Sequence, residues 1–95
     1  MIAFSWDERK NAANKEKHGV AFEEAQTVFF DENAREFPDP DHSEEENRFL
    51  MLGFGCHLRL LIVCHCVRSS GLEVRIISAR KATRKERNAY AEGER

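Results

Sequence analysis

The most hydrophobic stretch of the chain is short. The apolar run from Leu60 to Cys64 sits inside a wider hydrophobic segment, Leu58 to Val67, which ends at turn-like residues on both sides. A run of this length suits a buried strand, whereas a helix that crosses a bilayer needs about 20 apolar residues. We therefore expect this segment to be the central strand of a sheet. No part of the sequence predicts a membrane span.

Further strands are predicted on both sides of the central one. They cover residues 2–6, 34–37, 48–53 and 72–80. The turns at 53–57 and 68–71 are short, which favours antiparallel pairing of consecutive strands. Regular alternation in the last strand places its residues in two sets on opposite faces: Glu73, Arg75, Ile77 and Ala79 against Val74, Ile76, Ser78 and Arg80.

Two helices are predicted between the first two strands. The first is polar and runs from Asp7 to Gly19, with Ser5 or Asp7 as its N-cap and Gly19 in the left-handed position at its end. The second covers about 21–30 and carries its apolar residues along one face. Two amphipathic helices are expected to cover one face of the sheet.

A third helix follows the last strand. Thr83 and Glu86 form a capping box at its start, and it ends near Gly93. The order of elements is therefore β-α-α-β-β-β-β-α. This order predicts an α+β fold in one domain over 1–95, with helices packed on a mainly antiparallel sheet of about four to five strands.

Length, cysteine content and charge limit the classes of function. A chain of 95 residues supports one modest core, and its three cysteines and non-basic N-terminus predict a reducing, cytoplasmic setting rather than secretion. Residues 31–47 contain eight acidic residues and one basic residue, whereas 75–95 contain seven basic and three acidic. The basic segment could contact nucleic acid, although a mixed-charge solvated surface is the plainer interpretation.

The first candidate site lies on the first helix. Lys10, Asn14 and Lys17 follow one stripe, and His18 lies at the helix C-terminus, where the dipole favours the imidazolium. Such a face could bind an RNA phosphate and transfer a proton. The alternative is a solvated helix face.

The second candidate site surrounds the start of the third helix, because basic side chains there reinforce the affinity of helix N-termini for phosphate. These side chains are Arg80, Lys81, Arg84, Lys85 and Arg87. Tyr90 could stack on a base or, alternatively, pack on the edge of the sheet.

His65 and the cysteines raise two further possibilities. Alternation places His65 on the open face of the sheet, as a possible acid or base, and places Cys64 and Cys66 in the core. A zinc site that adds Cys56 and His57 is disfavoured because the spacing contains no CxxC pair. Within the acidic loop 39–46, residues 39–44 could hold Mg²⁺, but a solvated turn is the expected interpretation. We expect no metal and no cofactor.

Three blocks of sequence resemble one protein family, the BrnT toxins, over nearly the whole chain. The blocks are Phe4 to Asp7 with Lys10, Asn14, 17–20 and 22–25, then 39–44, then 75–87. Position 21 is often Ser in such sequences and is Ala21 here, so a helix N-cap worth about 1 kcal/mol is absent.

The resemblance implies the toxin half of a bacterial type II toxin–antitoxin pair, with a fold similar to RelE. Such toxins are ribonucleases that cut RNA and arrest growth. The implied partner is a BrnA-like antitoxin with a ribbon-helix-helix part, which brings the complex to its own operator DNA.

Metal-free RNA cleavage by the 2′-hydroxyl needs a base, an acid and cations. The expected cations are Lys17, Arg80 and Arg84, and the expected acid and base are His18 and His65, with His42 or Glu23 in reserve. The expected phosphate contacts are Lys10, Asn14, Arg75, Lys81, Arg87 and Tyr90.

Two alternatives stay open. One is a non-catalytic module that binds an antitoxin as co-repressor. The other is a metal-dependent nuclease that uses the acidic loop.

Overall fold

The computed structural model describes residues 2–42 and 47–93, and these form the expected elements in the expected order. The strands and α-helices are β1 (Ala3–Ser5), α1 (Glu8–His18), α2 (Phe22–Ala25), β2 (Arg35–Pro38), β3 (Arg48–Phe54), β4 (Leu60–Arg68), β5 (Glu73–Lys81) and α3 (Arg84–Gly93). The 3₁₀ helices are η1 (Gln26–Phe30), η2 (Pro40–His42) and η3 (Ser69–Gly71). The predicted α+β class is confirmed.

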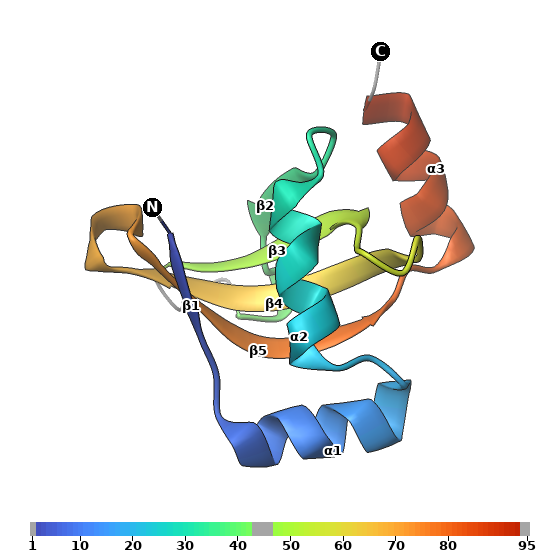
Figure 1. The fold of residues 1–95 in the computed structure, drawn as a ribbon. Helices are drawn as coiled ribbons and strands as arrows, with labels where there is room; N and C mark the ends of the chain where they lie inside the picture. Colours follow the sequence, from blue (N-terminus) through green and yellow to red (C-terminus); the bar gives the residue numbers. More distant parts are fainter. Residues whose placement is uncertain (1, 43–46, 94–95) are drawn as a thin grey trace.

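The strands form one sheet in the order β1-β5-β4-β3-β2 (Figure 1). β2, β3, β4 and β5 pair antiparallel with their neighbours, whereas β1 runs parallel to β5. β4 is central, as its hydrophobicity predicts. β1 pairs with β5 only as far as Arg75, so within the described residues no strand lies on the outer side of the second half of β5.

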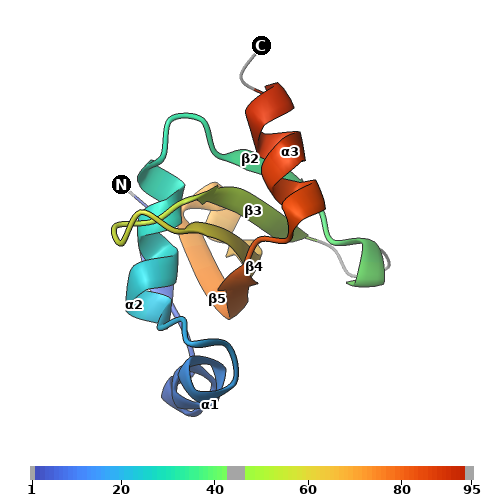
Figure 2. The same cartoon turned by 90° about the vertical axis from the view of Figure 1, so that its right-hand side faces the viewer.

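The two faces of the sheet are covered differently. Figure 2 shows α2 on one side of β3, β4 and β5, and α3 on the other. The α2 side carries the main apolar cluster, in which Phe22 and Val28 pack on Leu61, Val63 and Ile76. The α3 side carries a smaller cluster that contains Leu52, Leu60, Ile62 and Tyr90. The expectation that helices cover one face is therefore incomplete, because α3 packs on the opposite face.

A β-bulge in β5 overturns the predicted division of that strand. Cys64 pairs with Ser78 but the next residue, His65, pairs with Ile76, so Ile77 has no partner in β4. The alternation changes phase at this point. Val74, Ile76 and Ala79 therefore share the main cluster, where strict alternation had separated Ala79 from the other two.

Two elements differ from the prediction by more than one residue. β4 begins at Leu60 rather than Leu58, because Leu58 adopts a positive φ of 59° in the turn, where its N–H bonds to Gly55 O. The helix predicted at 21–30 is α-helical only over Phe22–Ala25 and continues as the 3₁₀ helix η1. A 3₁₀ continuation is common at the end of an α-helix.

The helix ends follow their local chemistry. Asp7 caps α1, because its Oδ1 accepts the Arg9 N–H at 2.8 Å, while Ser5 donates instead to Glu73. Gly19 closes α1 with a φ of 71°, in the left-handed region that glycine enters without strain. In the described part of the chain, no helix is long and apolar enough to cross a membrane.

Candidate active site

A cleft of about 320 Å³ lies on the α3 side of the sheet. Its floor consists of neighbouring residues from β3, β4 and β5: Leu50, Ile62, Cys64, Ser78 and Arg80. Its rim consists of His18 from α1, of Asp39, Asp41 and His42 from the segment between β2 and β3, and of Arg48 at the start of β3. The cleft therefore brings two imidazoles and two guanidinium groups to one place.

Asp39 organises one wall of the cleft. Its Oδ2 lies 3.0 Å from His42 Nδ1 and 3.4 Å from the Cys64 thiol, which donates to it, and Arg48 Nε lies 3.7 Å away. Burial disfavours the Asp39 carboxylate, but hydrogen bonds from the Asp41 N–H, His42 and Cys64 outweigh that effect and lower the pKa of Asp39. An ionised Asp39 that holds Nδ1 leaves His42 Nε2 available for proton transfer.

Arg80 forms the opposite part of the floor and is held by α3. Its Nη1 and Nη2 donate to the two carboxylate oxygens of Glu86 at 2.8 and 2.9 Å. Glu86 also forms the predicted capping box, because its carboxylate accepts the Thr83 N–H and its own N–H donates to Thr83 Oγ1. The hydrogen bonds from Arg80 lower the pKa of Glu86 to about 2, despite partial burial. The same contacts raise the pKa of Arg80.

His18 and the lysines of α1 lie beside the cleft. A shallower hollow of about 210 Å³ contains His18 and Ser78, which also line the cleft, and adds Lys10 and Lys17. The predicted Lys/His face of α1 is therefore continuous with the cleft.

Asn14 does not present its amide to a ligand. It is 7% exposed, and its amide nitrogen donates to Val20 O and Ala79 O, both at 2.8 Å. Its Oδ1 accepts the Ala79 N–H at 3.1 Å. These backbone contacts occupy the group that was expected to bind phosphate, so we remove Asn14 from the phosphate contacts.

The predicted position of His65 is wrong. His65 is fully buried on the α2 side of the sheet, where its ring packs edge-on against Phe29, with 4.8 Å between the ring centroids. Its ring nitrogens face Val63 O at 3.1 Å and Glu36 Oε2 at 3.2 Å. Cys64 is buried as expected, but it lies on the α3 side at the cleft floor, and burial raises the pKa of its thiol. Cys66 is half-buried. A buried His65 cannot reach an RNA substrate, so we remove it from the acid–base set.

Tyr90 packs on the sheet and is not exposed for stacking on a nucleotide base. It is 7% exposed, its ring packs against Phe54 at 5.3 Å, and its hydroxyl donates to Asp31 at 2.7 Å. The plainer of the two interpretations of Tyr90 is therefore correct.

The other predicted residues line neither cavity. Arg75 lies near Ser5, with 3.5 Å between Nη1 and Oγ. Glu23 is exposed and accepts a hydrogen bond from Asn11 at 3.0 Å. The remaining basic residues are exposed near the start of α3: Lys81, Arg84, Lys85 and Arg87.

The metal hypotheses receive no support from the described geometry. Within 2–42 and 47–93, no three His, Cys, Asp or Glu side chains come close enough to hold a metal ion together. Part of the acidic loop, residues 43–46, lies outside the described residues.

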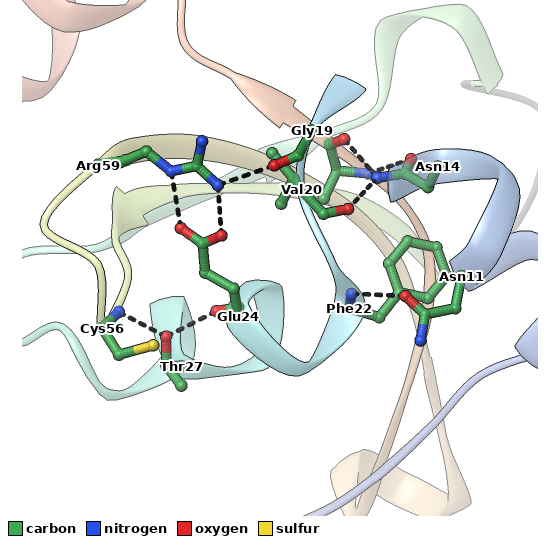
Figure 3. A network of polar contacts seen from close by, with 10 residues as sticks. Asn11, Asn14, Gly19, Val20, Phe22, Glu24, Thr27, Cys56 and Arg59 are labelled. Carbon is green, nitrogen blue, oxygen red and sulfur yellow. Dashed lines mark hydrogen bonds and ion pairs between the residues drawn. The ribbon is translucent and has the colours of Figure 1, made fainter. Parts of the chain in front are cut away.

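Several polar contacts behind the cleft were not predicted. Figure 3 shows Arg59 paired with the buried Glu24 while its Nη2 donates to Gly19 O at 3.0 Å. Asn11 accepts the Phe22 N–H at 2.8 Å. Hydrophobic periodicity does not reveal a polar residue such as Asn11 that is buried within a helix. It also does not reveal a charged pair such as Glu24 and Arg59, which are far apart in sequence.

The chain matches known proteins along most of its length. Residues 6–86 match the family model described as the ribonuclease toxin BrnT of type II toxin–antitoxin systems. The 1.1 Å crystal structure of the Brucella abortus ribonuclease toxin BrnT is similar, with a TM-score of 0.67 and 23% identity over 88% of this chain and 100% of that one. No curated protein matches the chain. Because the family model spans most of the sequence, this chain belongs to the BrnT family of ribonuclease toxins of type II toxin–antitoxin systems.

Proposed function

We propose that this toxin cleaves RNA in the cleft by attack of the 2′-hydroxyl on the adjacent phosphorus, without a metal ion. The 2′-oxygen forms a bond to phosphorus and loses its proton to a base, while the 5′-oxygen leaves and gains a proton from an acid. The products are a 2′,3′-cyclic phosphate and a 5′-hydroxyl end. The observation that carries the proposal is the convergence of His18, His42, Arg48 and Arg80 on one cleft.

His42 is the proposed base. The carboxylate of Asp39 orients its ring and stabilises the imidazolium that forms when it takes a proton. His18 is the proposed acid, because it is the second imidazole that lines the cleft and the end of α1 positions it there. Each role needs one protonation state, so the cleavage rate should follow a bell-shaped pH profile.

The cations that would stabilise the phosphorane are Arg80 and Arg48, with Lys17 in the adjoining hollow. The bidentate pair with Glu86 fixes the position of the Arg80 guanidinium, and the N–H groups that do not face Glu86 would contact the phosphate. Lys10, Lys81, Arg87 and Arg75 remain proposed contacts for flanking phosphates, where exposed cations add salt-dependent affinity. Arg84, expected among the catalytic cations, lines neither the cleft nor the hollow and is proposed as a flanking contact instead.

The proposed partner is a BrnA-like antitoxin with a ribbon-helix-helix part, through which the complex would bind operator DNA in the cytoplasm. Membership of a type II toxin family implies an antitoxin. We expect an acidic or amphipathic antitoxin segment to cover the cleft, because it would complement Arg48 and Arg80 in charge. Binding should therefore weaken as salt rises.

The test is cleavage of a labelled RNA by toxin separated from its antitoxin, with EDTA present. We expect cyclic-phosphate ends, and losses in rate of about 10²-fold or more for His18→Ala, for His42→Ala and for Arg80→Ala. His57→Ala is the matched control, because His57 is an exposed histidine outside the cleft. Cleavage that EDTA abolishes would contradict the metal-free mechanism, and His18 and His42 variants as active as His57→Ala would contradict the assigned roles.

A further inference from the structure

Helix α1 is attached to the rest of the protein in an unusual way. Its buried residues are two asparagines, Asn11 and Asn14, while its other side chains are exposed or half-buried. A surface helix normally buries an apolar stripe. The position of α1, and of the residues it carries into the cleft, therefore depends on the hydrogen bonds of two amides.

Asn14 connects two parts of the chain that carry proposed catalytic side chains. It accepts the N–H of Ala79 and donates to the carbonyl of the same residue, so it pairs with β5 as a neighbouring strand would. The strand β1 ends its pairing at Arg75, so Asn14 takes the place of a strand beside Ala79. Its second donated hydrogen bond goes to Val20 O (Figure 3).

The contacts of Asn14 lie next to the cleft in sequence and in space. Ala79 immediately precedes Arg80, and Val20 is two residues beyond His18. Ala79, His18 and Arg80 all line the cleft. The buried amide of Asn14 therefore links the end of α1, which carries His18, to the strand β5, which carries Arg80.

Asn11 has the same burial but different partners. It is 8% exposed, against 7% for Asn14, and its Oδ1 accepts the Phe22 N–H. Its amide nitrogen donates to Glu23 at 3.0 Å and to Glu8 at 3.3 Å. Asn11 thus joins α1 to α2, and none of these hydrogen-bond partners lines the cleft.

We infer that Asn14 is a positioning residue for RNA cleavage, which sets the placement of His18 relative to Arg80. The inference rests on the proposed function, because it concerns the same cleft. Asn14 touches no substrate in this role, so its loss should slow the chemical step more than it weakens RNA binding. A displacement of about 1 Å at a reacting group can lower a rate about 10²-fold.

The experiment compares Asn14→Ala with Asn11→Ala, each at its measured folded fraction. For Asn14→Ala we expect kcat to fall about tenfold or more while KM stays within about twofold. For Asn11→Ala we expect kcat within about twofold of wild type. Asn14→Asp is the second variant in case Asn14→Ala does not fold, because it keeps the size of the side chain and the acceptor for Ala79 N–H but loses both donated hydrogen bonds; the same fall in kcat is expected.

A readout without RNA separates this inference from the proposed function. In ¹H–¹⁵N spectra, the Asn14 variants should shift the backbone signals of His18 and Arg80, and Asn11→Ala should leave those two signals in place. If wild-type toxin does not cleave RNA, the proposed function fails, and the spectra still decide whether Asn14 joins the two segments. Equal losses of kcat in the Asn11 and Asn14 variants, or unmoved His18 and Arg80 signals, would overturn the inference.

Discussion

Helices α1 and α3 have 11 and 10 residues and both begin with a side-chain cap, yet they attach to the sheet by different means. α3 buries Tyr90 in an apolar cluster on β3 and β4. α1 buries two amides that bond to backbone groups. Apolar burial tolerates small shifts, whereas hydrogen bonds require particular distances and angles. The helix that carries His18 is thus held by directional contacts, which suits a proton-transfer group.

The strongest test of the α3 side of this comparison is Tyr90→Ala. Truncating a buried aromatic side chain should lower the free energy of unfolding by about 4 kcal/mol. Tyr90→Phe keeps the ring and loses only the hydrogen bond to Asp31, so it should cost about 1 kcal/mol. Urea unfolding of both variants measures the difference. Similar costs for the two variants would mean that the hydroxyl, not the ring, holds α3.

Arg59→Ala tests the polar anchoring at the end of α1. It leaves Glu24, whose side chain is 5% exposed, without its cation, and removes the donor to Gly19 O, so we expect a loss of about 3 kcal/mol. Glu24→Ala should cost less, because the Arg59 side chain is 32% exposed and can be hydrated when unpaired. The double variant should be more stable than Arg59→Ala alone. An equal cost for the two single variants would contradict this asymmetry.

Acid titration should reveal the contact between α3 and the cleft. The pKa of Glu86 falls from 4.5 to about 2 on folding, so its ion pair with Arg80 contributes its full stability above about pH 4.5 and loses it as the pH falls through about 2. Glu86→Gln should therefore lose less stability than wild type over that range. Glu92→Gln, an exposed change on the same helix, is the control and should follow wild type. Parallel curves for Glu86→Gln and wild type would show that the pair does not persist in solution.

The smallest expected effect concerns α2. Ala21 has the extended backbone of an N-cap, with φ −83° and ψ 150°, but offers no side-chain hydrogen bond. Ala21→Ser should raise the free energy of unfolding by about 1 kcal/mol. Ala12→Ser, an exposed change inside α1, should instead lower it slightly, because serine is the poorer helix former. Thermal unfolding of the two variants is sufficient, and a loss of stability in Ala21→Ser would contradict the cap.

Hydrophobic periodicity and capping residues predicted most of the fold. The central strand, the ends of α1 and the capping box of α3 all depend on neighbours in sequence, and all are confirmed. The face of Ala79 was assigned wrongly, because a bulge depends on how two strands pair and leaves no mark in either strand alone. The face of His65 was assigned wrongly for another reason: both faces of β4 are apolar and covered, so hydrophobicity does not show which of them is open.

The site was predictable only where its residues have a local signal in the sequence. His18 and Arg80 stood out because each lies at a helix end with charged neighbours, and both line the cleft. His42 was a reserve candidate, since its wall of the cleft depends on the contact of Asp39 with Cys64 in β4, 25 residues away in sequence. Arg48 was missed, because a lone arginine at a strand start has no distinguishing spacing.

The unpaired Ile77 has a consequence for chain length. β5 contains one residue more than the part of β4 with which it pairs. A relative with a gap at this point would have a regular strand that still directs Ser78 and Arg80 into the cleft and Ala79 toward the helices. A gap in a regular part of β5 would invert the sides of the residues beyond it. In an alignment of this fold, single-residue length changes within β5 are therefore expected at Ile77.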